Sequence, residues 1–174
     1  PAQHVRWKTR EFDIEEIEVG SSLLEKYAEL EKDGYSYFNL PRAQVDELLQ
    51  DIEGLELSNT TGTEKVVFGP NIADAKSSAL ATDFSDPLPC VLTMPAVARL
   101  AANKHILRLV RKHLGALPRL SGASISVYQA GKSGALPSDD WHLDKGPLSW
   151  LKLFVYLSDV APETGPHAFV AGSH

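Results

Sequence analysis

Residues 121–129, Ser-Gly-Ala-Ser-Ile-Ser-Val-Tyr-Gln, mark the point where the pattern of the chain changes from helical to strand-like. Before Pro118, apolar residues recur at helical spacing between capping and terminating residues. After it, residues 150–156 are hydrophobic and rich in strand-forming types, and residues 168–170 indicate a last short strand. Because the helices come first and the strands later, the sequence predicts an α+β domain rather than a parallel α/β sheet.

Three amphipathic helices are predicted in the first part of the chain, at residues 22–33, 41–53 and 93–115. The first opens with a capping box, in which the side chains of Ser22 and Glu25 satisfy free backbone donors reciprocally. Thr93 is the predicted N-cap of the third helix. We expect Asn103-Lys104 to divide this third segment into two helices.

The stretch between the second and third helices is harder to interpret. Glycine, proline, serine and aspartate recur over residues 55–92, and the pattern indicates one strand there, at residues 65–68. Another strand is predicted earlier, at residues 35–40. We expect the rest of 55–92 to be irregular, either as a lid or binding loop or as an ordinary surface excursion.

The composition limits the classes of protein to consider. The 174 residues suit one domain, 1–174, which we expect to be mostly helical over 1–118. A net charge of −6 disfavours a nucleic-acid partner, because such partners require clustered lysines and arginines. No apolar run is long enough to span a membrane, and residues 1–8 lack the apolar core of a signal peptide. The single cysteine, Cys90, cannot form an internal disulfide, so we expect a cytoplasmic protein.

The triplet His142-Leu143-Asp144 is the candidate functional site. On a strand, side chains two residues apart point to the same face, so this histidine and aspartate could bind one metal ion. The alternative is a structural pair in a core or turn, since such triplets also arise by chance. With a second histidine from elsewhere, the pair would form the facial triad that holds Fe(II) and leaves positions open for a co-substrate and oxygen. A zinc hydrolase fits less well, because a helical His-x-x-x-His pattern and a second cysteine are absent.

Further motifs surround this triplet in a defined order. They are Asp33-Gly34-Tyr35, the helical segment 96–115 ending in Leu114-Gly115, Trp141-His142-Leu143-Asp144, Leu157-Ser158-Asp159-Val160, Glu163-Thr164-Gly165-Pro166 and Ala171-Gly172-Ser173-His174. With these motifs, the chain from about Gly34 to its end resembles the phytanoyl-CoA dioxygenase family of Fe(II)/2-oxoglutarate-dependent oxygenases. The resemblance implies N-terminal helices packed on a double-stranded β-helix (jelly roll), whose first strands would lie within 119–174.

The same resemblance implies a set of cofactors and site residues. His142 and Asp144 would be the first two ligands of Fe(II), and Ser126, Tyr128 and Phe154 would line the pocket of the co-substrate, 2-oxoglutarate. The implied function is hydroxylation or another oxidation of a small organic substrate by O2, with coupled decarboxylation of 2-oxoglutarate. A carboxylate at Asp144 argues against the related halogenases, which carry a small residue at that position.

The family also requires a distal histidine and, a few residues later, an arginine or lysine that pairs with the far carboxylate of 2-oxoglutarate. Neither is evident here: His167 and His174 follow Asp144, but in similar proteins the histidine of the Gly-Ser-His motif does not bind iron. We therefore expect the chain to be incomplete at its C-terminus. The alternative is a catalytically inactive binding or interaction module that lacks the distal histidine. The substrate and the oligomeric state stay open.

Overall fold

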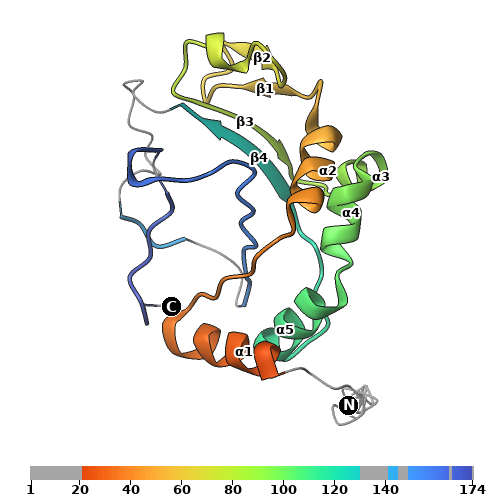
Figure 1. Ribbon diagram of the computed structural model, residues 1–174, viewed down its shortest axis with the longest axis vertical. Helices are drawn as coiled ribbons and strands as arrows, with labels where there is room; N and C mark the ends of the chain where they lie inside the picture. Colours follow the sequence, from red (N-terminus) through yellow and green to blue (C-terminus); the bar gives the residue numbers. More distant parts are fainter. Residues whose placement is uncertain (1–20, 130–140, 145–148, 165, 174) are drawn as a thin grey trace, which may run out of the picture.

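The computed structural model describes residues 21–129, 141–144, 149–164 and 166–173 (Figure 1). The first 20 residues, Gly165 and His174 lie outside this description, as does the Ser22 side chain of the predicted capping box. The elements in chain order are α1 (Ser21–Asp33), α2 (Arg42–Ile52), β1 (Glu56–Ser58), β2 (Lys65–Val67), η2 (Ile72–Asp74), β3 (Ala79–Phe84), α3 (Leu88–Thr93), α4 (Pro95–Ala101), α5 (Lys104–Leu114), β4 (Ala123–Tyr128) and η4 (Pro162–Thr164).

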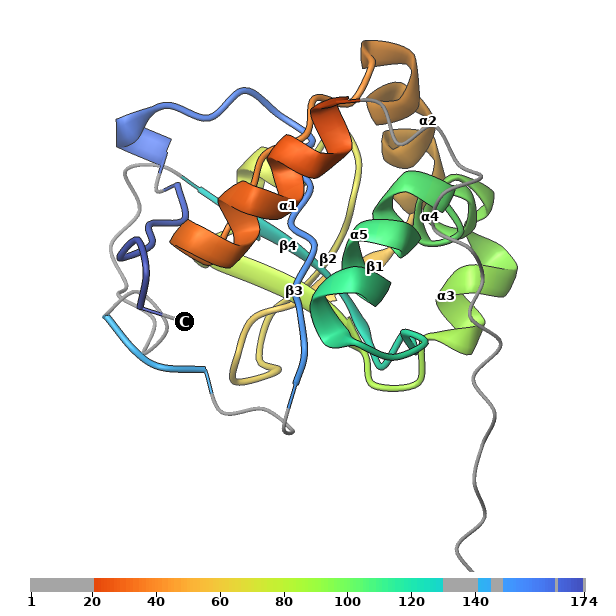
Figure 2. The ribbon, with the colours of Figure 1, turned by 90° about the horizontal axis from the view of Figure 1, so that it is seen from below.

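The strands form one antiparallel sheet in the order β2-β1-β3-β4. Figures 1 and 2 show α2, α3 and α4 grouped beside this sheet, with α1 and α5 packed together farther from it. Among the described residues, no helix combines the length and the apolar character needed to cross a membrane. The helices together with the antiparallel sheet confirm the prediction of a mixed helix-and-strand, α+β fold.

The pairing of β3 with β4 is the longest in the sheet. Its register runs from Ala79 opposite Tyr128 to Phe84 opposite Ala123. Half-buried and exposed residues alternate along β4, as expected of a strand with one packed face. Ile125 on the packed face contacts both of the buried clusters that the described residues form. The strand predicted at 121–129 is thus confirmed, and its inner face is part of the core.

Within the described residues, buried side chains of the core gather in two clusters. Their members are Ile52, Cys90 and Met94 in one, and Leu57, Ala75 and Leu80 in the other. In sequence, the buried hydrophobic residues of the described chain extend from Leu30 to Leu109. Leu157, which follows the predicted site, is half-buried against the first cluster. The segment that carries the site is therefore attached to the core through partly buried contacts.

Side-chain caps fix the starts of α4 and α5. The carboxylate of Asp51, at the end of α2, accepts hydrogen bonds from the backbone N–H groups of Ala96 (2.6 Å) and Val97 (3.1 Å) in the first turn of α4. The prediction that Thr93 caps this helix is wrong, because Thr93 is the last residue of α3. Asn103 caps α5 with its own side chain, which confirms the predicted division of the 93–115 segment.

The expectation that residues 55–92 are mostly irregular is wrong. This stretch contains β1, β2, β3 and most of α3, and hence three of the four strands of the described sheet. Only β2 was predicted. β1 is three residues long and pairs with both of its neighbours, so its strand character depends on partners elsewhere in the chain rather than on a local pattern. Leu57 at its centre is completely buried.

Three other predicted strands are not strands within the described residues: 35–40, 150–156 and 168–170. The first and the last contact each other through side chains, since the rings of Tyr35 and Phe169 stack with centroids 5.8 Å apart. Nearby, the backbone N–H of Gly172 donates a hydrogen bond to the Asp33 carbonyl (2.9 Å). In the part of the chain that the structure describes, contacts of this kind rather than a strand ladder join the first and last of these segments, and the jelly roll stays a prediction.

Candidate metal centre

Two segments meet at the candidate site, residues 141–144 and residues 149–157. The Nε2 atom of His142 lies 3.5 Å from Oδ1 of Asp144, and the two side chains are 48% and 44% exposed. Residues 141–144 belong to no strand, so the expectation that a strand carries this pair is wrong. The two donor atoms nevertheless lie close to each other. We call His142 and Asp144 the half-site.

The separation of the two donors suits one metal ion. Metal–ligand bonds of about 2.1 Å at right angles place neighbouring donors about 3 Å apart, and the observed separation is 3.5 Å. An imidazole and a carboxylate are also the donor types of the Fe(II) facial triad. Within the part of the chain that the structure describes, no three His, Cys, Asp or Glu side chains gather to hold a metal ion. The described half-site therefore offers two of the three side chains that such a triad needs.

Lys152 contacts the half-site and was missed by the sequence analysis. Its Nζ atom lies 2.7 Å from Oδ2 of Asp144, whereas Oδ1 faces His142. This hydrogen bond is the main reason why the pKa of Asp144 lies below its ordinary value, so the carboxylate is ionised at neutral pH. Trp150, Lys152 and Phe154 alternate along the sequence. In an extended segment this spacing places all three on one face, which was the available signal for Lys152.

His167 borders the same group of side chains. Its ring centroid lies 4.1 Å from that of Phe154, and its backbone N–H donates to the hydroxyl of Tyr156 (3.0 Å). Burial, and then the positive charge of Lys152, lower the pKa of His167 below its ordinary value. His167 is therefore neutral at pH 7, although it forms no metal-binding group with the described half-site.

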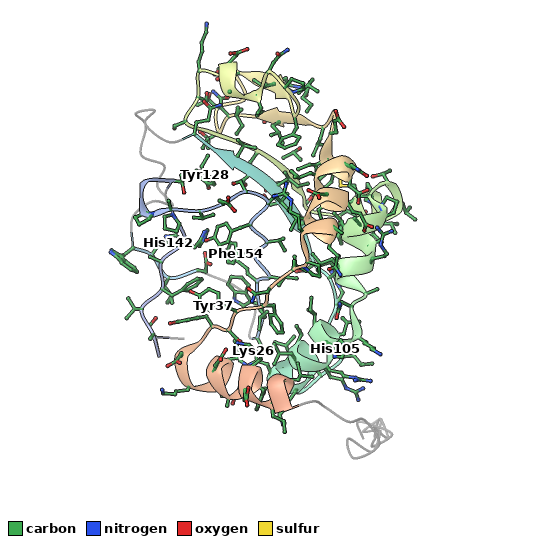
Figure 3. The ribbon with its side chains drawn as sticks, viewed as in Figure 1. Lys26, Tyr37, His105, Tyr128, His142 and Phe154 are labelled. Carbon is green, nitrogen blue, oxygen red and sulfur yellow. The ribbon has the colours of Figure 1, made fainter. Side chains whose placement is uncertain are left out.

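The three residues predicted to line the 2-oxoglutarate pocket lie on two different segments. Phe154 lies near Lys152, which contacts the half-site, and its ring contacts that of His167. Ser126 and Tyr128 lie on the exposed face of β4. Figure 3 shows Tyr128, Phe154 and His142 on the same side of the sheet. The structure thus brings Phe154 to the half-site and leaves Ser126 and Tyr128 on the neighbouring strand face.

Comparisons with models of protein families, with curated proteins and with solved structures find no match to this chain. The resemblance to the phytanoyl-CoA dioxygenase family therefore rests on the sequence motifs quoted above.

Proposed function

We propose that this protein is an Fe(II)- and 2-oxoglutarate-dependent dioxygenase that uses O2 to oxidise a small organic substrate in the cytoplasm. The observation that carries the proposal is the 3.5 Å approach of His142 Nε2 to Asp144 Oδ1, two donors of the types used in the Fe(II) facial triad. In this proposal the antiparallel β3–β4 pair belongs to a jelly roll that holds the site.

Each residue around the half-site has a role in this proposal. Iron and 2-oxoglutarate, when bound, supply an oxidant made from O2 with loss of CO2 from the co-substrate. His142 would bind the metal through Nε2 and Asp144 through Oδ1, while Lys152 holds Oδ2 of the same carboxylate. An outer hydrogen bond of this kind fixes the orientation of a ligating carboxylate. The rings of Trp150 and Phe154 flank the ammonium and provide apolar walls.

The test is iron-dependent turnover of 2-oxoglutarate by protein expressed from its complete reading frame. The wild type should form succinate only with Fe(II). His142→Ala should lower the rate by about 100-fold or more, because even the loss of an outer-shell partner costs 10–100-fold in metal affinity or activity. His105→Ala, an exposed histidine on α5, is the matched control and should leave the rate unchanged.

A binding or interaction module without catalysis is the second candidate function. It is favoured by one observation: in the described residues, Asp144 forms an ion pair with Lys152 and no third metal ligand joins the half-site. In such a protein the ammonium of Lys152 would take the place of the metal as the partner of Asp144. Absence of iron-dependent turnover in the wild type would support this module and contradict the enzyme.

A further inference from the structure

Helix α5 carries a concentrated positive charge that the overall composition conceals. Residues 87–138 contain seven lysines and arginines but no aspartate or glutamate, so the net charge of −6 divides into +7 for this stretch and −13 for the rest of the chain. Four of the seven lie on α5, which has no acidic side chain: Lys104, Arg108, Arg111 and Lys112. We call these four residues the basic face. A chain that is acidic overall thus presents one strongly cationic helix.

The spacing of the four residues places them on one side of α5. Residues three or four apart are neighbours on a helix, and Arg108 lies four residues after Lys104 and four before Lys112. The apolar side chains of the helix lie on the other side, where Leu109 is buried. Figure 1 shows α1 and α5 packed together at one end of the molecule. Lys104 and Lys112 are exposed and Arg108 is half-buried, so the basic face is accessible to solvent.

The stability of the helix does not account for this charge. Lys104 is the first residue of α5, where the positive end of the helix dipole disfavours a cation. Four basic side chains elsewhere form ion pairs with carboxylates: Lys26, Arg42, Lys65 and Arg99. Within the described residues Lys104, Arg108 and Lys112 form no ion pair, and the ammonium of Lys112 lies over the ring of Tyr27 (4.4 Å). Their charge is therefore available to an anion from outside the chain.

Exposed leucines accompany the basic face. Leu107, three residues after Lys104, is 38% exposed, and Leu117 and Leu120 in the segment after α5 are 78% and 45% exposed. A lipid bilayer accommodates both kinds of side chain, because cations bind its anionic headgroups while apolar side chains enter the acyl boundary. A nucleic acid offers phosphates but no apolar layer, and α5 has no aromatic side chain on which bases could stack. The combination favours a lipid surface.

We propose that the basic face of α5 binds the anionic surface of a lipid membrane, as a peripheral contact without a spanning helix. The net charge of −13 on the rest of the chain is repelled by such a surface, which orients α5 toward it. Each lysine or arginine close to an anionic surface contributes about fivefold in affinity, so three of them contribute about 100-fold. The inference does not depend on the half-site, and it adds a location to the proposed function.

The experiment measures sedimentation of protein, expressed from the complete reading frame, with vesicles of phosphatidylcholine alone or of equal parts phosphatidylcholine and phosphatidylserine. One variant removes three charges of the basic face: Lys104→Gln/Arg108→Gln/Lys112→Gln. A second variant keeps all three: Lys104→Arg/Arg108→Lys/Lys112→Arg. The matched control removes three charges that are already paired with carboxylates on α2, β1 and α2: Arg42→Gln/Lys65→Gln/Arg99→Gln. Thermal unfolding of each variant verifies that it is folded.

The wild type, the charge-keeping variant and the matched control should sediment with phosphatidylserine vesicles and not with phosphatidylcholine vesicles. Binding should weaken as salt is added, because salt screens exposed charges. The triple glutamine variant of the basic face should lower the partition coefficient about 100-fold. If that variant is folded and binds as the wild type does, or if the wild type binds both kinds of vesicle equally, the proposal is overturned. It is also overturned if the wild type binds a duplex DNA oligonucleotide and not the phosphatidylserine vesicles, because the partner would then be a nucleic acid.

Discussion

Replacement of Asp51 by alanine should destabilise the protein, because Asp51 caps α4 from a different helix. Met94 occupies the N-cap position of α4 and makes no side-chain cap of its own. Instead, Oδ2 of Asp51 accepts hydrogen bonds from the backbone N–H groups of Ala96 (2.6 Å) and Val97 (3.1 Å). These are the donors that an N-cap side chain normally satisfies. Without the Asp51 carboxylate, these two partly buried N–H groups would lose this hydrogen-bond acceptor.

The size of the effect follows from these contacts. Loss of an N-cap side chain costs about 1 kcal/mol, and hydrogen bonds to a charged group contribute about 1.5 kcal/mol or more where they are shielded from water. Because the contacts of Asp51 are only partly buried, we expect Asp51→Ala to lower the free energy of unfolding by about 2 kcal/mol. In a chain of this size the melting temperature should fall by about 4–8 °C. Asp51→Asn keeps one acceptor oxygen and should lose about half as much.

Equilibrium unfolding in urea measures this difference directly. The matched control is Asp46→Ala on the same helix, where the carboxylate pairs with Arg42 at 2.8 Å but the two side chains are 49% and 74% exposed. An exposed pair of this kind contributes less than about 0.5 kcal/mol. If the free energies of unfolding of Asp51→Ala and Asp46→Ala differ by less than about 0.5 kcal/mol, the Asp51 cap does not stabilise α4.

Two further predictions concern the core and the response to acid. Leu57→Ala should lower the free energy of unfolding, measured in urea, by about 3–4 kcal/mol, because Leu57 is 0% exposed. Leu92→Ala, at a 73% exposed position, should lower it little. Equal losses of free energy in the two variants would contradict the assignment of the core. The hydroxyl of Ser77, and then the backbone N–H of Lys76, lower the pKa of Glu64 below its ordinary value of 4.5. This stabilisation is present above pH 4.5 and is lost as the pH falls through the folded-state pKa. In Glu64→Gln, the free energy of unfolding should therefore fall less steeply with decreasing pH in that range. An unchanged slope of the free energy against pH would refute this role of Glu64.

Local patterns predicted the elements whose determinants are contiguous in the sequence. The helices α1 and α2, the break at Asn103 and the strand β4 all follow from periodicity and caps within a few residues. β1 and β3 were not predicted, because their strand character depends on pairing with distant segments. The cap of α4 illustrates the same limit. Asp51 lies 45 residues before Ala96, so a local analysis assigned the cap to Thr93 instead.

In the candidate site, too, the sequence predicts the local contacts and not the distant ones. His142 and Asp144 are two residues apart, and their short spacing brings the donors together even though no strand carries them. Lys152 is eight residues beyond Asp144, and the hydrogen bond between them depends on how the segments 141–144 and 149–157 meet in the fold. A pair of candidate ligands this close together can therefore be recognised in a sequence before its fold is known. The alternation of Trp150, Lys152 and Phe154 indicates a shared face, but only the folded protein shows that the ammonium of Lys152 contacts Asp144.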